Sequence, residues 1–212
     1  AAGDEVICLT ISAGLSGTYA SAKAAAESLP DMPIHVLDTR LVSVGLGQPV
    51  LQAARAAAAG QSVEEIMALV GKMCRSYGLV FTLVTLRYVY MGGRIGRAEN
   101  LVGTLLDIKP LMTFRDGVVH PIGRVRGRKN VRGSVMKALE EQVPAGTTVL
   151  SGIVHTDNIE DAEWAANAVR ERRSTTHSPL WMRRESSMGS ASVGGDRSTP
   201  TGPTRFRGPM CT

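Results

Sequence analysis

The chain has 212 residues, of which 43% are hydrophobic and only 4% aromatic, so a core built from aliphatic side chains is expected. No apolar run approaches the roughly 18 residues of a membrane span and no signal peptide opens the chain, which together predict a cytoplasmic protein without stable membrane insertion. The net charge is +5, but residues 173–212 carry six arginines and two acidic residues, a net of +4. Because this leaves only +1 for the first 172 residues, the body of the chain argues against nucleic acid as a partner.

Two strand–helix units are predicted at the start. The apolar residues 6–11 read as a buried strand, followed by a helix over 17–29, and a second strand over 34–38 precedes a helix over 41–59 that Gly60 ends. Ser62 and Glu65 have the spacing of a capping box for a helix over 63–77. This order implies parallel strands and right-handed crossovers. Because a parallel sheet usually has more strands, we expect the chain to lack an N-terminal part or another polypeptide to complete the sheet.

The second half has a different pattern. Strands are predicted over 79–84, 108–114, 118–122 and 147–155, with a hairpin turn at Asp116-Gly117, and helices over 85–90, 98–106 and 131–142. A last helix begins with Asp157 as its N-cap and ends near Arg172. The predicted fold class is therefore α/β, with a partial parallel-sheet lobe over residues 1–78 and an α+β lobe over 79–172. Residues 173–212 are predicted to be disordered, because 28 of these 40 residues are Ser, Thr, Arg, Gly or Pro.

The turn between the first strand and the first helix is the main candidate ligand site. Unpaired N–H groups and the helix dipole favour an anion at such a place. Without the lysine of a P-loop or the glycine spacing of a dinucleotide site, a carboxylate suits the turn better than a nucleoside triphosphate. The alternative is a capped helix start, in which Ser16 only satisfies backbone donors. Candidate residues here are Ser12, Ala13, Gly14, Ser16, Gly17 and Thr18; Ser43 and Gly45 open the next helix with small side chains that allow a ligand or a neighbouring helix to approach.

A second group of candidates is cationic. Arg94, Arg124, Arg126, Arg128 and Lys129 suit an acidic partner or a phosphoryl group, although charges on an edge strand also serve to prevent aggregation. The four histidines are scattered, and Cys8, Cys74 and Cys211 form no Cys-x-x-Cys pair. We predict no catalytic residue, no metal site and no cofactor.

With these residues in view, the chain resembles the DegV family of bacterial fatty-acid-binding proteins over roughly residues 5–172. The matching segments are 11–19 (ISAGLSGTY), 36–47 (VLDTRLVSVGLG), 85–86 (TL), 92–95 (GGRI), 105–110 (LLDIKP) and 124–129 (RVRGRK). The resemblance implies two lobes with a fatty acid between them and its carboxylate at Ser12. It also implies that Arg94, Arg124, Arg126 and Arg128 face a separate ATP-dependent fatty acid kinase, which makes an acyl phosphate for phospholipid synthesis. The chain itself would be the binding subunit rather than an enzyme.

Two departures from the family pattern are expected. The family's first strand–helix unit and its Thr-Ser-Gln-Pro-type segment are not found, so the chain is expected to be an N-terminally truncated fragment. The family's glycine-rich ending with a carboxylate-binding histidine is also not found, and the composition of 173–212 is typical of out-of-frame translation of a GC-rich gene. Two alternative functions stay open: an enzyme acting on a small acid or phosphate, and a basic regulatory or nucleic-acid-binding protein.

Overall fold

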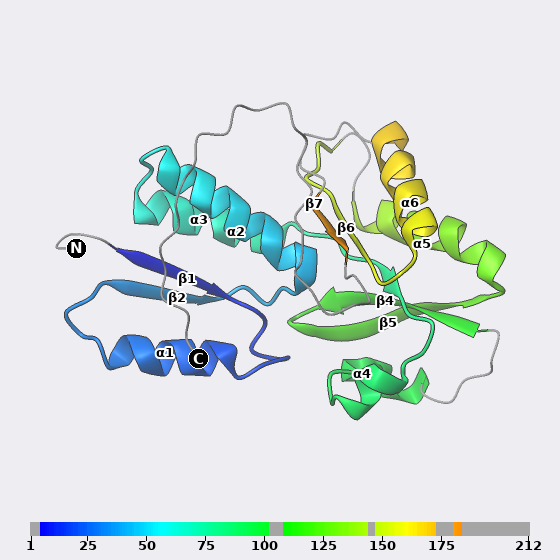
Figure 1. The fold of residues 1–212 in the computed structure, drawn as a ribbon, viewed down its shortest axis with the longest axis horizontal. Helices are drawn as coiled ribbons and strands as arrows, with labels where there is room; N and C mark the ends of the chain where they lie inside the picture. The colour runs from blue at the N-terminus through cyan, green and yellow to red at the C-terminus, as the bar shows by residue number, and fades with distance from the viewer. Residues whose placement is uncertain (1–4, 102–107, 144–146, 173–179, 184–212) are drawn as a thin grey trace.

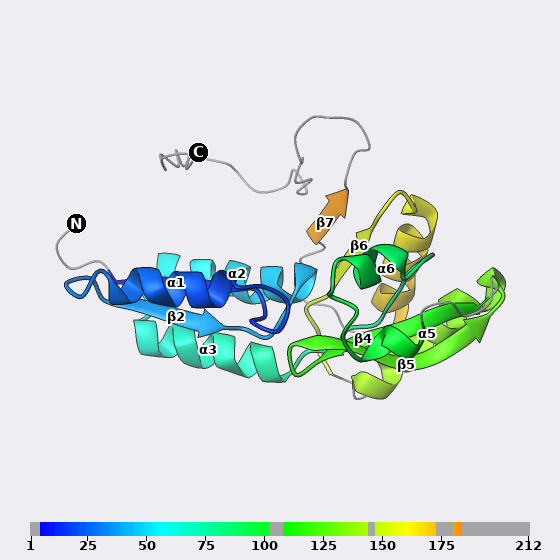
Figure 2. The same ribbon diagram turned by 90° about the horizontal axis from the view of Figure 1, so that it is seen from below.

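The computed structural model describes residues 5–101, 108–143, 147–172 and 180–183. Two groups of elements lie side by side in both ribbon views (Figures 1 and 2). We call residues 5–78 the first lobe and the later described residues the second lobe. No helix of the described residues has the length and apolar character needed to cross a membrane.

The first lobe is a parallel α/β unit, as predicted. Strands β1 (Val6–Thr10) and β2 (Ile34–Asp38) pair in parallel along their whole length. Helices α2 (Ser43–Ala58) and α3 (Val63–Arg75) cover one face, where Ile66 and Val70 pack against Ile7, Leu9 and Leu37. Helix α1 (Thr18–Glu27) lies over the opposite face (Figure 1).

Both predicted helix-end signals in this lobe are confirmed. Ser62 accepts a hydrogen bond from the N–H of Glu65, whose carboxylate accepts one from the N–H of Ser62. Gly60 has a φ of +77°, and the N–H groups of Gly60 and Gln61 donate to the carbonyls of Ala57 and Ala56. These bonds satisfy backbone groups that a helix end leaves open.

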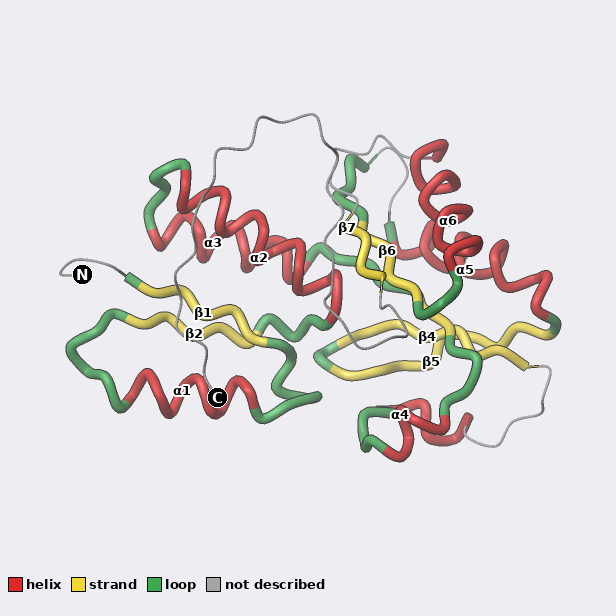
Figure 3. Tube along the Cα trace, in the orientation of Figure 1, coloured by secondary structure: helices red, strands yellow, loops and turns green. Residues whose placement is uncertain are grey.

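The second lobe is built on an antiparallel sheet of order β3-β4-β5, formed by Phe81–Thr82, Ile108–Arg115 and Val118–Arg126. The turn between β4 and β5 is the predicted one, with φ values of +51° at Asp116 and +80° at Gly117. These values fit a type I′ turn, the type that matches the twist of a hairpin. The tube drawing shows the hairpin pointing its turn toward the first lobe (Figure 3). The remaining elements are α4 (Arg87–Met91), η1 (Gly96–Leu101), η2 (Arg128–Asn130), α5 (Val131–Gln142), β6 (Gly152–His155), α6 (Ile159–Arg172) and β7 (Leu180–Arg183).

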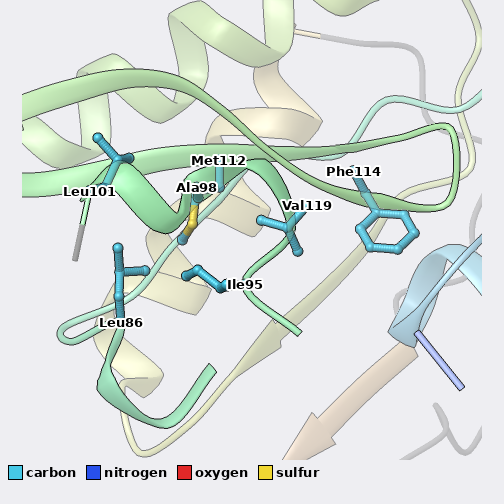
Figure 4. Close-up of a cluster of buried hydrophobic side chains, with 7 residues drawn as sticks. All are labelled: Leu86, Ile95, Ala98, Leu101, Met112, Phe114 and Val119. Carbon is cyan, nitrogen blue, oxygen red and sulfur yellow. The ribbon is translucent and has the colours of Figure 1, made fainter. Parts of the chain in front are cut away.

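One face of the antiparallel sheet carries the main apolar cluster. Met112 and Phe114 of β4 and Val119 of β5 pack with four residues from α4, η1 and their flanks (Figure 4). Those four residues are Leu86, Ile95, Ala98 and Leu101. Side chains alternate along a strand, so Leu111 and Thr113 of β4 point to the other face.

Several predicted boundaries in the second lobe are wrong. The strand over 79–84 is reduced to the two residues of β3, because only Phe81 and Thr82 pair with β4. The helix over 98–106 is a 3-10 helix over Gly96–Leu101, and residues 102–107 lie outside the described ranges. Asn158, rather than Asp157, caps α6, since its side-chain oxygen accepts from the N–H of Asp161.

The segment predicted to be disordered contains one strand. β7 pairs in parallel with β6, from Gly152 opposite Leu180 to His155 opposite Arg183. The apolar run Leu180-Trp181-Met182 suits a strand, although the composition of the surrounding residues hides it. The other residues of 173–212 lie outside the described ranges.

Candidate functional site

The turn after β1 meets the tip of the β4–β5 hairpin where the two lobes join (Figure 1). We call residues 12–18 the hydroxyl turn, and Asp116 with Gly117 the hairpin tip. The loop from Thr39 to Val42, between β2 and α2, and the side chain of Arg94 also contact the hydroxyl turn. The hydroxyl turn, this loop and Arg94 belong to segments on which the family resemblance rests, whereas the hairpin tip does not.

Ser12 is the centre of this junction. Its side chain is 0% exposed, and its hydroxyl donates a hydrogen bond of 2.7 Å to the carbonyl of Gly117. The same oxygen accepts a bond of 3.2 Å from the N–H of Gly14. The predicted carboxylate-binding hydroxyl is thus already fully engaged within the protein.

The two turns interlock closely enough that glycine is needed on both sides. A Cβ on Gly117 would lie 2.5 Å from the Ser12 Oγ, and a Cβ on Gly14 would lie 2.8 Å from the Gly117 carbonyl oxygen. Gly117 also needs glycine for its positive φ. Glycine at these two positions therefore allows one lobe to reach the backbone of the other.

The backbone donors of residues 12–16 all have partners within the protein, which corrects the expectation of open N–H groups for this part of the turn. The N–H of Ser12 donates to Leu41, and those of Leu15 and Ser16 donate to the Ser12 carbonyl. The N–H of Ala13 donates to the Asp38 carboxylate at 3.1 Å. That carboxylate is itself an anion, so the Ala13 N–H is a poor place for a second one.

The other candidate ligand residues lie beside Ser12 along the chain. The hydroxyls of Ser16 and Thr18 are 2.7 Å apart, and the N–H of Thr18 donates to Ser16, so both shape the start of α1. Gly17 is the N-cap residue of that helix. Ser43, with a φ of +55°, and Gly45 lie on the first turn of α2, just after Leu41.

The cationic candidates fall into two places. Arg94 is exposed and its Nε donates to the carbonyl of Leu15 at 3.3 Å, which puts its charge beside the hydroxyl turn. Arg124 and Arg126 are exposed on the same side of β5, with buried Val125 between them. Arg94 lies two residues before Gly96, and Gly96 contacts Val119 near the start of β5. At about 3.4 Å per residue, Arg126 lies roughly 20 Å beyond Val119 along the same strand. The structure therefore does not bring Arg94 together with Arg124, Arg126 and Arg128.

Sequence reasoning missed three residues of the junction. Asp38 accepts hydrogen bonds from Ala13 and Arg40, and buried Thr39 donates to the carbonyl of Thr10 at 2.7 Å. Asp38 ends β2 and Thr39 directly follows it, and this place at the end of a strand is the signal that could have identified them. The third is Gly117, which the sequence marks only as a turn residue, since its partner Ser12 is 105 positions away.

Tyr77 ties the end of the first lobe to the hairpin. Its hydroxyl donates a 2.6 Å hydrogen bond to the carbonyl of Phe114. Burial raises the pKa of Tyr77 to about 12, and the negative charge of Asp116 acts in the same direction. The protonated tyrosine is therefore favoured in the folded chain.

We expect Tyr77→Phe to lower the free energy of unfolding by about 1 kcal/mol at pH 8, the usual net contribution of one hydrogen bond. Because the folded pKa is raised, the contribution of Tyr77 is complete below about pH 10, the unfolded value, and is lost as the pH rises toward 12. Urea unfolding at pH 8 and pH 11 measures this. The difference between wild type and variant should shrink at pH 11, and Tyr88→Phe, at a residue 73% exposed, should change nothing at either pH. A constant difference would contradict the assignment.

Besides the junction, the described parts of the chain could offer a metal site, a functional role for His155 or a groove for a ligand. No group of three or more His, Cys, Asp or Glu residues there could hold a metal ion. His155, at the end of β6, accepts a hydrogen bond from the N–H of Asn158 and so supports the start of α6. A groove of about 290 Å³ lies between α1 and β2, but it contains none of the predicted site residues; Tyr19, Lys23, Ala26, Glu27, Ile34 and Val36 line it.

Comparison with known proteins supports the family resemblance. Residues 1–194 match the sequence model of a family described as uncharacterised proteins of the DegV family. This match extends beyond Arg172, where the resemblance read from the sequence ends. A DegV domain-containing protein from Deinococcus radiodurans is 42% identical over 140 residues, which are 66% of this chain and 50% of that protein.

Two further relatives are described as binding a fatty acid. A fatty acid-binding protein from Thermotoga maritima is 31% identical over 157 residues, covering 73% of this chain and 54% of that protein. The solved structure of a fatty-acid-binding DegV family protein from Thermus thermophilus has a TM-score of 0.77 at 32% identity, covering 85% of this chain and 64% of that one. The chain spans about half the length of these curated relatives.

Proposed function

Because this chain belongs to the DegV family, we propose that it binds a long-chain fatty acid between its two lobes, with the carboxylate at the hydroxyl turn. The relatives from Thermotoga maritima and Thermus thermophilus are described as binding fatty acids, and the proposed role of this chain is likewise that of a carrier. It needs no metal or cofactor, since the ligand is held by hydrogen bonds and by burial of its acyl chain.

The observation that carries this proposal is the contact between a polar turn and an apolar cluster. Leu15 of the hydroxyl turn and Val42 of the neighbouring loop pack against the cluster that contains Phe114 and Val119. A fatty acid requires this arrangement, with hydrogen-bond donors for the head beside apolar side chains for the tail. Burial of the tail contributes about 0.8 kcal/mol per CH₂ group, which is enough to hold a long acyl chain.

The test is to identify the lipid that the chain carries. We expect mass spectrometry of gently purified protein, or of protein incubated with stearate-containing vesicles, to find one fatty acid per chain. Ser12→Ala should weaken retention by about tenfold, because a hydrogen bond to a charged group contributes more than one between neutral groups. Ser21→Ala, on the exposed side of α1, is the matched control and should retain the fatty acid.

A chain that neither co-purifies with a fatty acid nor takes one up from vesicles would contradict the proposal. Equal retention by Ser12→Ala and wild type would leave fatty-acid binding intact but remove Ser12 from the site.

We propose in addition that the loaded chain presents the carboxylate to an ATP-dependent fatty acid kinase. Arg124, Arg126 and Arg128 form an exposed cationic surface suited to an acidic protein partner. Changing Arg124 and Arg126 together to glutamate should strongly slow acyl-phosphate formation by such a kinase while stearate binding persists. An unchanged rate would show that this surface does not face the kinase.

A further inference from the structure

Resting on the proposed function, we propose that the Ser12–Gly117 hydrogen bond is a built-in competitor of the ligand, so that loading with a fatty acid releases the hairpin tip from the hydroxyl turn. The bond joins the two lobes at the predicted carboxylate position. Carboxylate binding and hairpin docking would then be alternative states of the same hydroxyl group.

The competition arises because the Ser12 hydroxyl has only one hydrogen that it can donate to a hydrogen bond. A serine hydroxyl has one hydrogen to donate, and Ser12 gives it to the Gly117 carbonyl. An ionised carboxylate only accepts hydrogen bonds, so the Ser12 hydroxyl can bind it only by donating to it in place of the Gly117 carbonyl. Gly117 must then lose its bond to Ser12.

The neighbouring backbone donors give the carboxylate little alternative. The N–H groups of Ser12, Leu15 and Ser16 donate to carbonyls, and that of Ala13 donates to the Asp38 carboxylate. A second carboxylate beside Asp38 would meet like-charge repulsion. The N–H of Gly14 donates to the Ser12 Oγ itself, so within residues 12–16 the Ser12 hydroxyl is the donor for which the head group must compete.

Access requires movement, because the Ser12 side chain is 0% exposed. The hairpin tip packs directly against it, close enough that a single added carbon on Gly117 would lie 2.5 Å from the Oγ. The end of β4 next to the tip is held separately, by the bond from Tyr77 to Phe114 and by the bond from Thr113 to Leu79. These two bonds confine the movement to the tip, beyond Phe114.

Hydrogen–deuterium exchange of the intact chain, with and without stearate supplied from phosphatidylcholine vesicles, tests this directly. We expect the amides of residues 115–118 to exchange severalfold faster in the loaded chain, while those of α3 exchange at the same rate or more slowly. Native mass spectrometry of the same samples reports whether stearate is bound. Bound stearate with unchanged or slower exchange at the tip would overturn the competition alone, whereas absence of bound stearate would overturn the proposed function and this inference with it.

A pair of variants provides an independent measurement. Gly117→Ala pushes the tip away from Ser12, so the stearate Kd should fall about fivefold, the equivalent of one net hydrogen bond. Gly60→Ala imposes the same backbone strain at a φ of +77° with no atom within 4 Å, and should leave the Kd unchanged. An equal or higher Kd in Gly117→Ala than in Gly60→Ala would overturn the inference.

Discussion

Replacing Gly117 by alanine is expected to lower the free energy of unfolding by about 3 kcal/mol, from backbone strain and from a steric clash acting together. The φ of +80° at this residue is unfavourable for any residue with a Cβ. The new carbon would lie 2.5 Å from the Ser12 Oγ, so either the hairpin tip or the hydroxyl turn must shift. The shift would remove the hydrogen bond between the lobes and leave a serine hydroxyl without its partner.

Chemical denaturation of Gly117→Ala and Gly60→Ala separates the two causes. Gly60 has nearly the same φ, +77°, but open space around the position of a Cβ. Gly60→Ala should therefore lower the free energy of unfolding only by the cost of backbone strain, about 1 kcal/mol. Equal losses in the two variants would show that the contact with Ser12 does not stabilise the fold.

Met112→Ala should have a comparable or larger effect, a loss of about 2–5 kcal/mol, as is usual for a methionine removed from a core. Met112 is 0% exposed and lies at the centre of the apolar cluster on the β4–β5 sheet (Figure 4). Truncation removes buried apolar surface and leaves a cavity that the surrounding strands can fill only in part.

Met91→Ala is the matched control, because Met91 ends α4 with 69% of its surface exposed. The same chemical change there should alter the free energy of unfolding by less than about 0.5 kcal/mol. Urea unfolding of both variants measures the difference. A small loss in Met112→Ala would show that this cluster is not a tightly packed core.

Local features of the fold could be predicted from the sequence because each is encoded within a few residues. The capping box at Ser62, the left-handed Gly60 and the Asp116-Gly117 turn all depend on neighbours in the chain. Predictions failed where pairing decides the outcome. β3 has two residues because only these meet β4, and β7 exists in the structure as the partner of β6.

The candidate site could be predicted only in part for the same reason. Ser12 follows a strand and precedes a helix, so its place near a ligand could be inferred from topology. Its bond to Gly117 spans 105 residues, and no periodicity or turn signal connects the two. The sequence predicts open N–H groups in this turn, whereas tertiary contacts with Leu41 and Asp38 occupy those of Ser12 and Ala13, before α1 begins.

The most direct test of the central claim is a crystal structure of this chain after loading with stearate. We expect the carboxylate within hydrogen-bonding distance of the Ser12 Oγ, and the acyl chain against Leu15 and Val42 at the edge of the apolar cluster. A stearate bound elsewhere, for example in the groove between α1 and β2, would contradict the proposed placement of the fatty acid.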